Sequence, residues 1–339
     1  MVEVFDFFSG CGGTSLGFQN YGFRVIGALD YDKDSAETFR NNFPKVTFIE
    51  KDIRQVKPED LSGILMKQRK TPLLFCACAP CQPFTGQRRL IKENDSRKSL
   101  LSEFERFVRY WKPDFIFLEN VPGIQNINKS GEAFSGFTEL LEKDRYNFDY
   151  SVIKASEIGV PQVRKRFILT ASSNGRKVRP IKEILEKYSQ PETSVKDWIA
   201  DLPAIKAGER HQTIPNHAAF NLSEQNLIRI QHTPEGGDRR DWPEGLRVGC
   251  HKNYQGHTDV YGRMKWDEPA STLTTRCISY SNGRFGHPEQ HRAISVREAA
   301  RLQTFPDDFV FYGNLGSCAR QVGNAVPPLM AQRFSESFI

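Results

Sequence analysis

Two short runs of this 339-residue chain, Phe75–Ala79 and Phe115–Leu118, are apolar at every position. A strand with one face in water alternates apolar and polar residues, so a strand that is apolar throughout is covered on both faces. Such strands belong to parallel sheets, which crossover helices cover on both sides. Between the two runs lies the clearest helical pattern, Arg97–Trp111, with apolar residues at helical spacing. The chain is therefore expected to form an α/β fold.

The alternation of strands and helices extends from residue 1 to about residue 172. Strands are expected at Val2–Phe8, Arg24–Asp30, Val46–Ile49, Leu73–Cys78, Asp114–Leu118, Phe148–Ile153 and Arg166–Thr170, and helices at Thr14–Tyr21 and Asp34–Asn42. This order predicts a doubly wound, mostly parallel sheet. The pattern ends after Thr170, and helical signal returns with the capping box at Ser295, which opens Val296–Gln303. A last helix is expected after Pro327–Pro328, through Ala331–Phe338.

The predicted domains follow from this break. Residues 1–173 and 292–339 form the α/β domain, and residues 174–291 form a smaller, loop-rich domain. The net charge of +6 permits a polyanionic partner. Seven cysteines, without a signal peptide or an apolar run of about 18 residues, indicate reduced thiols, a cytoplasmic location and no membrane contact.

A glycine-rich turn follows the first predicted strand. It comprises Phe8, Ser9, Gly10, Cys11, Gly12 and Gly13. Asp30 ends the second strand, where a carboxylate accepts hydrogen bonds from ribose hydroxyls, and Asp52 is placed similarly after the third. The turn therefore indicates a nucleoside site for a nicotinamide cofactor, a flavin or S-adenosylmethionine. Because residue 15 is Ser, the dinucleotide fingerprint is incomplete, and a tight turn without a ligand is the alternative.

Cys81 follows another strand, in a turn that begins at Pro80. Its spacing from Cys78 is that of a metal or redox pair, but a second close pair of cysteines is absent from the sequence, so we predict no metal site. Cys76 and Cys78 are expected to pack as small apolar residues. The basic segment Thr85–Lys98 after Cys81 is suited to an anionic substrate, which makes Cys81 the candidate nucleophile.

Two further motifs are expected near Cys81. Glu119 follows the strand Asp114–Leu118 and therefore reaches the sheet edge that carries Cys81 and the glycine turn. Strand alternation places Arg164 and Arg166 on one face and Lys165 on the other. The structural alternative for Glu119 is that its carboxylate caps a helix. The alternative for Arg164 and Arg166 is that they lie on a solvent-exposed edge of the sheet.

These motifs, in this order, resemble those of the bacterial-type DNA (cytosine-5)-methyltransferases. The resemblance rests on Asp6–Gly13, Pro80–Gln82, Glu119–Val121, Gln162-x-Arg164-x-Arg166, Arg297–Pro306 and Gln321–Pro327. It spans nearly the whole chain, and it implies a Rossmann-like class I methyltransferase domain with a target-recognition domain in the region 174–291.

The resemblance implies S-adenosylmethionine as cofactor, with S-adenosylhomocysteine as product. Its implied contacts are Phe8, Ser9, Gly10, Cys11, Gly12, Gly13, Asp30, Tyr31, Asp52, Ile53, Pro80, Asn324 and Ala325. Phe8 stacks near the adenine, Asp30 binds the ribose hydroxyls and Asn324 closes the pocket. Asp30 and Tyr31 stand where the family often has Glu and Trp, and both exchanges keep the chemistry.

The implied catalytic residues are Cys81, Glu119, Arg164 and Arg166. The thiolate of Cys81 attacks carbon 6 of a cytosine flipped out of double-stranded DNA, which activates carbon 5 for methylation. Glu119 shares a proton with ring nitrogen 3, and Arg164 supplies positive charge and holds the carbonyl oxygen of the base.

DNA contacts are expected from the loop after Cys81 and from the target-recognition domain. They are Gln82, Thr85, Arg88, Arg89, Arg239, Arg240, Arg263, Thr272, Leu273 and Arg276. The chain is expected to be a monomer that acts with a cognate restriction endonuclease or in another defence system. The alternatives are a transfer-RNA cytosine-5 methyltransferase, a catalytically inactive DNA-binding module and a nicotinamide oxidoreductase.

Overall fold

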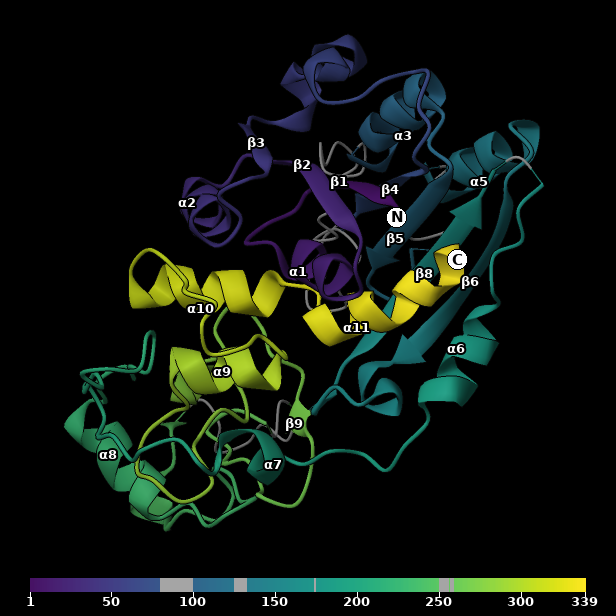
Figure 1. Cartoon of the computed structure of the whole chain (residues 1–339). Helices are drawn as coiled ribbons and strands as arrows, with labels where there is room; N and C mark the ends of the chain where they lie inside the picture. Colours follow the sequence, from purple (N-terminus) through teal and green to yellow (C-terminus); the bar gives the residue numbers. More distant parts are fainter. Residues whose placement is uncertain (80–99, 125–132, 174, 250–255, 257–258) are drawn as a thin grey trace. The chain divides into compact units, whose positions relative to one another are not determined.

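The computed structural model describes residues 1–339 apart from 80–99, 125–132, 174, 250–255 and 257–258 (Figure 1). The chain divides into two compact units. The first comprises Met1–Ile158, Lys165–Ser189 and Val326–Ile339, and the second comprises Gly159–Arg164 and Gln190–Ala325. The sequence places residues 292–325 in the α/β domain, but in the structure they pack with the residues of the second unit. Which residues recognise a target stays a prediction.

A seven-stranded sheet forms the centre of the first unit, in the order β3-β2-β1-β4-β5-β8-β6 (Figure 1). The strands are β1 (Glu3–Phe7), β2 (Arg24–Asp30), β3 (Thr47–Glu50), β4 (Leu73–Ala77), β5 (Phe115–Asn120), β6 (Asn147–Lys154) and β8 (Lys165–Ser172). β8 runs antiparallel to both of its neighbours, β5 and β6, and the other pairs of neighbouring strands in this sheet are parallel. The predicted doubly wound, mostly parallel fold is confirmed.

Helices cover both faces of this sheet. They are α1 (Gly13–Asn20), α2 (Lys33–Asn42), α3 (Leu100–Trp111), α5 (Ala133–Lys143), α6 (Ile181–Tyr188) and α11 (Pro328–Phe334). On one face Phe7 of β1 packs edge-on against Phe104 of α3. On the other, Phe117 of β5 packs against Phe18 of α1 and Phe334 of α11. Strand alternation sends neighbouring aromatic residues to opposite layers, which explains why the strands are apolar throughout.

The predicted elements of the first unit agree with the structure within two or three residues at most ends. The last helix differs: α11 already begins at Pro328, because proline fits the first helical position, and a 3₁₀ turn, Ser335–Phe338, follows it. Helices α5 and α6 were not predicted from the sequence. Residues 97–99, at the start of the predicted helix Arg97–Trp111, lie outside the described residues.

The second unit consists of short helices joined by long loops. Its elements are α7 (Val195–Ile199), α8 (Glu224–Gln231), α9 (Val296–Leu302), α10 (Leu315–Asn324) and the parallel pair β7 (Gln162–Val163) and β9 (Ala270–Ser271). Trp242, Tyr280 and Ile230 form part of its core. Across the part of the chain described here, every helix is too short or too polar to cross a membrane.

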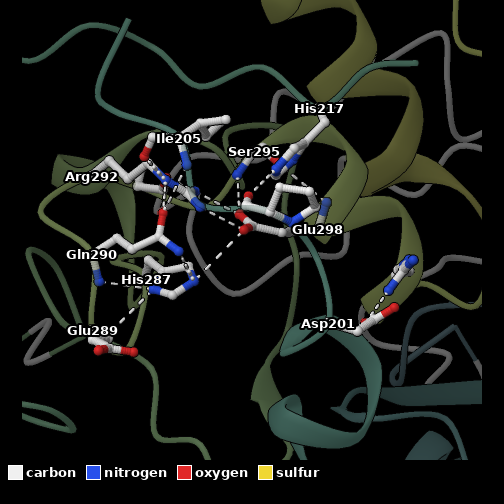
Figure 2. A network of polar contacts seen from close by, with 12 residues as sticks. Asp201, Ile205, His217, His287, Glu289, Gln290, Arg292, Ser295 and Glu298 are labelled. Atoms are coloured by element: carbon white, nitrogen blue, oxygen red, sulfur yellow. Dashed lines mark hydrogen bonds and ion pairs between the residues drawn. The ribbon is translucent and has the colours of Figure 1, made fainter. Parts of the chain in front are cut away.

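A buried ion pair organises the start of α9 (Figure 2). Arg292 donates two hydrogen bonds of 2.7 Å to the two carboxylate oxygens of Glu298. Glu298 also accepts the backbone N–H of Ser295, whose hydroxyl caps the Glu298 N–H, so the predicted capping box is confirmed. Burial raises the pKa of Glu298, but the hydrogen bonds and charge of Arg292 outweigh this effect and lower the pKa to about 2. The ionised pair therefore stabilises the folded unit.

The pH dependence of this contribution has a definite sign. Because the folded pKa of Glu298 is depressed below its ordinary value near 4.5, its stabilisation is complete above that value and disappears as the pH falls toward 2. We expect Glu298→Gln, which leaves Arg292 unpaired, to cost about 3–5 kcal/mol at neutral pH. The difference between wild-type and variant urea midpoints should shrink between about pH 5 and pH 2.

Glu289 supplies the matched control, since it lies near this network but is exposed. Glu289→Gln should leave the free energy of unfolding within about 0.5 kcal/mol of wild type. A difference for Glu298→Gln that does not change with pH would contradict the assigned charge state.

Candidate active site

Three parallel strands end at one edge of the sheet. Phe7, near the end of β1, is in register with Ala77 of β4, and Ala77 is in register with Leu118 of β5. The glycine turn, Cys78–Ala79 and Glu119 therefore follow at one edge, as the sequence predicts. Pro80 and Cys81 come directly after Ala79 but lie outside the described residues, as do Gln82, Thr85, Arg88 and Arg89.

The glycine turn alternates ordinary and left-handed backbone. Phe8, Gly10 and Gly12 have φ angles of 57°, 52° and 101°. A left-handed phenylalanine costs on the order of 1–3 kcal/mol, and such strain clusters at binding sites. A Cβ atom added at Gly10 would meet no described atom within 4 Å, so the turn borders open space there. The backbone is shaped to approach a ligand at Gly10.

Asp30 holds the turn from the end of β2. One carboxylate oxygen accepts the Gly10 N–H at 2.8 Å, and the other accepts the Asp32 N–H at 2.9 Å. Burial raises the pKa of Asp30, while these two N–H groups act in the opposite direction. Each oxygen has a second lone pair, so the carboxylate can accept two further hydrogen bonds. This chemistry fits a pair of ribose hydroxyls.

The other expected pocket residues differ in what they offer. Tyr31 is 67% exposed, so its ring is available for stacking, whereas Ile53 is buried. The carboxylate of Asp52 binds Arg54 through two guanidinium nitrogens, which lowers the pKa of Asp52. Asp52 is therefore already paired inside its own turn. Its expected contact with the cofactor stays a prediction.

Asp6 lies beneath the glycine turn and was not predicted as a site residue. Its carboxylate is buried and accepts the hydroxyls of Thr14 and Ser15 at 2.7 Å. Burial raises its pKa to about 6, although both hydroxyls lower it. Its neighbour across the sheet, Cys76, is fully buried as expected, and Cys78 is half-buried. An acidic residue among the buried apolar residues Val4, Phe5 and Phe7 of β1 was the available signal.

Glu119 and Arg166 form the ion pair of this edge. Arg166 Nε lies 2.8 Å from Glu119 Oε1, and their side chains are only 14% and 9% exposed. The pairing of β5 with β8 brings them together, since Asn120 is in register with Phe167. The carboxylate motif and the arginine motif were predicted to lie close together, and in the structure Glu119 and Arg166 make this contact.

Arg164 departs from the expected arrangement. It belongs to the second unit, where it is 2% exposed and donates to the carbonyls of Leu273 and Gly323. The expected shared face of Arg164 and Arg166 assumed one continuous strand. The chain instead breaks between β7, which ends at Val163, and β8, which begins at Lys165. Strand alternation therefore does not extend across Arg164.

The residues predicted to contact DNA differ in how far their side chains are exposed to solvent. Arg240 and Arg276 are exposed, Thr272 is half-buried, and Arg239 and Leu273 are buried. Arg263 is 2% exposed and donates to the carbonyls of Thr233, Ile230, His287 and Gln290. Because its guanidinium joins these loops from the inside, we no longer count Arg263 among the candidate base contacts. The remaining DNA contacts stay predictions.

Solved structures share this fold. A prophage-encoded protein of Escherichia coli, assigned to the DNA modification methyltransferases, superposes with a TM-score of 0.78 at 24% identity. The match covers 99% of this chain and 98% of that one. The Dnmt2 methyltransferase of Schizosaccharomyces pombe gives a TM-score of 0.67 at 17% identity, covering 99% and 97% of the two chains. At these identities the likeness establishes the fold alone.

Sequence comparisons establish the family. The model of the C-5 cytosine-specific DNA methylases matches residues 2–339. The Type II methylase M.HgiDII of Herpetosiphon aurantiacus is 40% identical over 341 residues, covering 98% of this chain and 94% of the relative. The Type II methyltransferase M1.HphI of Haemophilus parahaemolyticus is 34% identical, with coverages of 100% and 87%. On these matches, the chain belongs to the C-5 cytosine-specific DNA methylase family.

Proposed function

We propose that the chain transfers a methyl group from S-adenosylmethionine to carbon 5 of a cytosine flipped out of double-stranded DNA, with Cys81 as nucleophile. The observation that carries this proposal is the partly buried Glu119–Arg166 pair. It lies at the sheet edge where β4 ends, four residues before Cys81. A carboxyl group and a guanidinium fixed together there can address the ring nitrogen and the carbonyl oxygen of one pyrimidine.

The residues of the glycine turn fit the proposed cofactor. Asp30 has acceptor capacity for two ribose hydroxyls, Gly10 borders open space, and Tyr31 exposes its ring. Phe8, Ser9, Cys11, Gly12, Gly13, Asp52, Ile53, Pro80, Asn324 and Ala325 complete the proposed contacts. When bound, S-adenosylmethionine supplies an electrophilic methyl group on a positively charged sulfur.

Cys81 begins the proposed reaction as a thiolate. Its sulfur forms a bond to carbon 6, and the electron pair of the carbon 5–carbon 6 double bond moves toward carbon 5 and nitrogen 3. A proton from Glu119 on nitrogen 3 favours this attack, an assistance typically worth about 10²–10⁴-fold in rate. Carbon 5 then accepts the methyl group. Loss of the carbon 5 proton to a base expels the Cys81 thiolate, nitrogen 3 returns its proton to Glu119, and the aromatic ring is restored.

Arg166 positions Glu119 and can bind the base. Its Nε faces Glu119, and its Nη1 donates to the Lys165 carbonyl. A guanidinium has five N–H groups, so donors remain for the carbonyl oxygen of the cytosine. We therefore propose Arg166 for the substrate contact that the sequence analysis gave to Arg164. Arg164 becomes a proposed structural residue of the second unit.

The biological setting follows the names of the relatives. Type II methyltransferases act in restriction-modification, and we propose this setting and a partner endonuclease for the chain. Because the family is that of the DNA methylases, duplex DNA is the proposed substrate. Bisulfite sequencing of DNA from cells expressing the chain would identify the methylated site, and transfer RNA is the matched negative substrate.

Replacing the nucleophile is the direct test. We expect Cys81→Ala to keep duplex DNA and S-adenosylhomocysteine binding near wild type, because the variant removes one sulfur atom. Methyl transfer should disappear, since alanine cannot form the bond to carbon 6. The measurements are filter binding and incorporation of labelled methyl groups. Transfer at the wild-type rate would refute the proposed mechanism.

A covalent trap tests the same step independently. In DNA that carries 5-fluorocytosine at the target, the fluorine on carbon 5 cannot leave as a proton, so the sulfur–carbon 6 bond should persist. Peptide mass spectrometry should locate the adduct on Cys81, and Cys81→Ala should show none. An adduct on another cysteine would overturn the assignment of the nucleophile.

Arg166→Lys tests the pair at the sheet edge. Lysine keeps the charge but loses the planar fork that contacts Glu119 and the base together. We expect the single-turnover rate to fall about 10²–10³-fold, as for removal of one transition-state donor. Thermal stability should fall modestly, because the pair is partly buried.

Arg69→Lys is the matched control for this substitution. Arg69 Nε lies 2.9 Å from Asp114, just before β5, and these side chains are 16% and 12% exposed. The same exchange in a similar pair at the opposite end of β5 should lower stability without changing the rate. Equal losses of rate in both variants would mean that Arg166 is merely structural.

Asp30→Asn tests the nucleoside site. The amide keeps one acceptor but places its NH₂ group against the Gly10 or Asp32 N–H, and it removes the charge. Hydrogen bonds to a charged group contribute about 1.5–3 kcal/mol, so KM for S-adenosylmethionine should rise roughly 10–150-fold. The rate at saturating cofactor should stay close to wild type.

Asp32→Asn controls for the lost charge. Asp32 caps α2 by accepting the Ser35 N–H, and asparagine caps helices equally well. This neighbouring exchange should leave the cofactor KM near its wild-type value. A comparable increase in both variants would assign the effect to general electrostatics and not to ribose binding by Asp30.

A further inference from the structure

Positive charge gathers at the edge of the central sheet that lies opposite the candidate active site. The starts of β4, β5 and β6 and the end of β8 lie side by side there, because these strands are paired in register. The connecting segments at these strand ends, as far as the structure describes them, contain eight lysines and arginines but only two acidic residues. Their net charge of +6 equals that of the whole chain. These segments are 64–72, 112–114, 144–146 and 175–180. We call their exposed surface the basic edge.

The acidic residues of these segments are mostly covered, whereas most of the cations are exposed. The side chains of Asp114 and Asp144 are 12% and 18% exposed. Asp114 accepts Arg69 Nε at 2.9 Å and also the N–H of Leu73, the first residue of β4. Asp144 pairs with Lys112. The two carboxylates thus fix the segments from within and offset only part of the charge at the surface. The exposed cations are Lys67, Lys70, Lys112, Arg145, Arg176 and Lys177.

Two of the exposed cations stand in a backbone conformation that favours glycine. Lys112 and Arg145 lie just beyond the ends of α3 and α5, with φ angles of 46° and 58°. A side chain is strained there because its Cβ atom crowds a carbonyl oxygen, and glycine is the usual residue after a helix. A cation also stabilises the end of a helix, but it does so from any position in the last turn without this strain. Charge at these two points is therefore retained although glycine would relieve the backbone.

We propose that the basic edge binds the phosphate backbone of a second segment of duplex DNA, whatever its sequence. Neighbouring strands lie about 4.8 Å apart, so the row of strand ends from β4 to β6 spans about 14 Å. One strand of a duplex carries a phosphate every ~3.4 Å along its axis, so about four phosphates face this row. β5 has six residues, which places the basic edge about 20 Å from the candidate active site, at the opposite end of the strands. A short duplex bound at one edge therefore leaves the other free.

Duplex DNA fits the basic edge better than other polyanions do. Single-stranded nucleic acids need bare aromatic rings on which their bases stack. The rings beside these segments are covered: Lys67 Nζ lies 3.7 Å from the centroid of Tyr110, and Phe115 and Tyr146 are buried. Anionic membranes also take up apolar side chains, and Met66 is the one large apolar residue that these segments expose. The family of the chain acts on DNA, so duplex DNA is the polyanion that the chain meets.

A triple variant, Lys70→Gln/Arg145→Gln/Lys177→Gln, tests the basic edge. These three side chains form no ion pair within the described part of the chain, so their loss leaves no carboxylate unpaired. Binding of a labelled short duplex without the target site is measured by fluorescence anisotropy between about 50 and 200 mM salt. Each phosphate contact contributes about 0.9 to the slope of log affinity against log salt, so the slope should become shallower by about 2.7. The fall in affinity across this range should then be about 40-fold smaller than for the wild type. An unchanged slope would overturn the proposal.

Lys33→Gln/Lys57→Gln/Lys182→Gln is the matched control. It removes three exposed lysines of the same unit that lie outside the four segments. The net charge of the protein falls equally, but the slope should stay near its wild-type value. Equal losses in the two triple variants would mean that the duplex responds to net charge alone, which would refute a specific surface.

Lys112→Gly and Arg145→Gly separate DNA binding from helix capping. Glycine relieves the left-handed backbone but removes one cation. The melting temperature should therefore rise or stay constant, while the slope becomes shallower by about 0.9 in each variant. A lower melting temperature with an unchanged slope would assign both residues to helix capping and contradict the proposal.

The number of bound duplexes distinguishes a second DNA segment from an extension of the first. In sedimentation velocity at low salt, wild-type protein with excess short duplex should carry two duplexes, and the triple variant of the basic edge should carry one. A single duplex on the wild-type protein would refute the proposal. Stronger binding of single-stranded RNA or of phosphatidylserine vesicles than of duplex DNA would overturn the choice of partner. The triple variant should methylate a short target duplex at the wild-type rate, so failure of the proposed function is seen separately.

Discussion

The parallel alignment of β1, β4 and β5 is the constraint on which the candidate site depends. β4 and β5 are buried on both faces, and the parallel direction of the three strands brings their carboxyl ends to one edge. The glycine turn, the approach to Cys81 and Glu119 therefore meet there although Phe8 and Glu119 are 111 positions apart in the chain. Fold and chemistry are linked at this edge, because the same apolar strands create the core and present the polar residues.

The sequence predicted this edge well because its signals are local. Apolar runs define the strands, and turn residues define where they end. The placement of Arg164 was not predictable in this way. Whether the chain continues as one strand or breaks between Val163 and Lys165 depends on β9 and β5, the strands that β7 and β8 pair with, and both pairings are long-range. Asp6 was overlooked for a related reason: its role depends on Thr14 and Ser15, which only the folded turn brings to it.

Buried arginines hold the loops of the second unit together. Arg263 and Arg297 each donate to several backbone carbonyls, and Arg292 pairs with Glu298. A loop-rich unit lacks the sheet ladders that pair carbonyl groups elsewhere, yet buried carbonyls still need donors. Arginine supplies five of them from one side chain. Positive charge in this region is thus partly structural, which limits how far composition alone predicts DNA contacts.

The family motifs consequently divide into two physical classes. Phe8 of the glycine turn has a strained backbone, and Asp30 beside it can accept hydrogen bonds. Glu119 and Arg166 form a partly buried ion pair at the same edge of the sheet. Glu298 and Gln303, although equally characteristic of the family, are buried and bind backbone groups of the second unit. A motif match therefore assigns the chain to its family without assigning a role to each residue. Burial and hydrogen-bond partners make that distinction, and they are the reason why we propose Arg166 in place of Arg164 for the substrate contact.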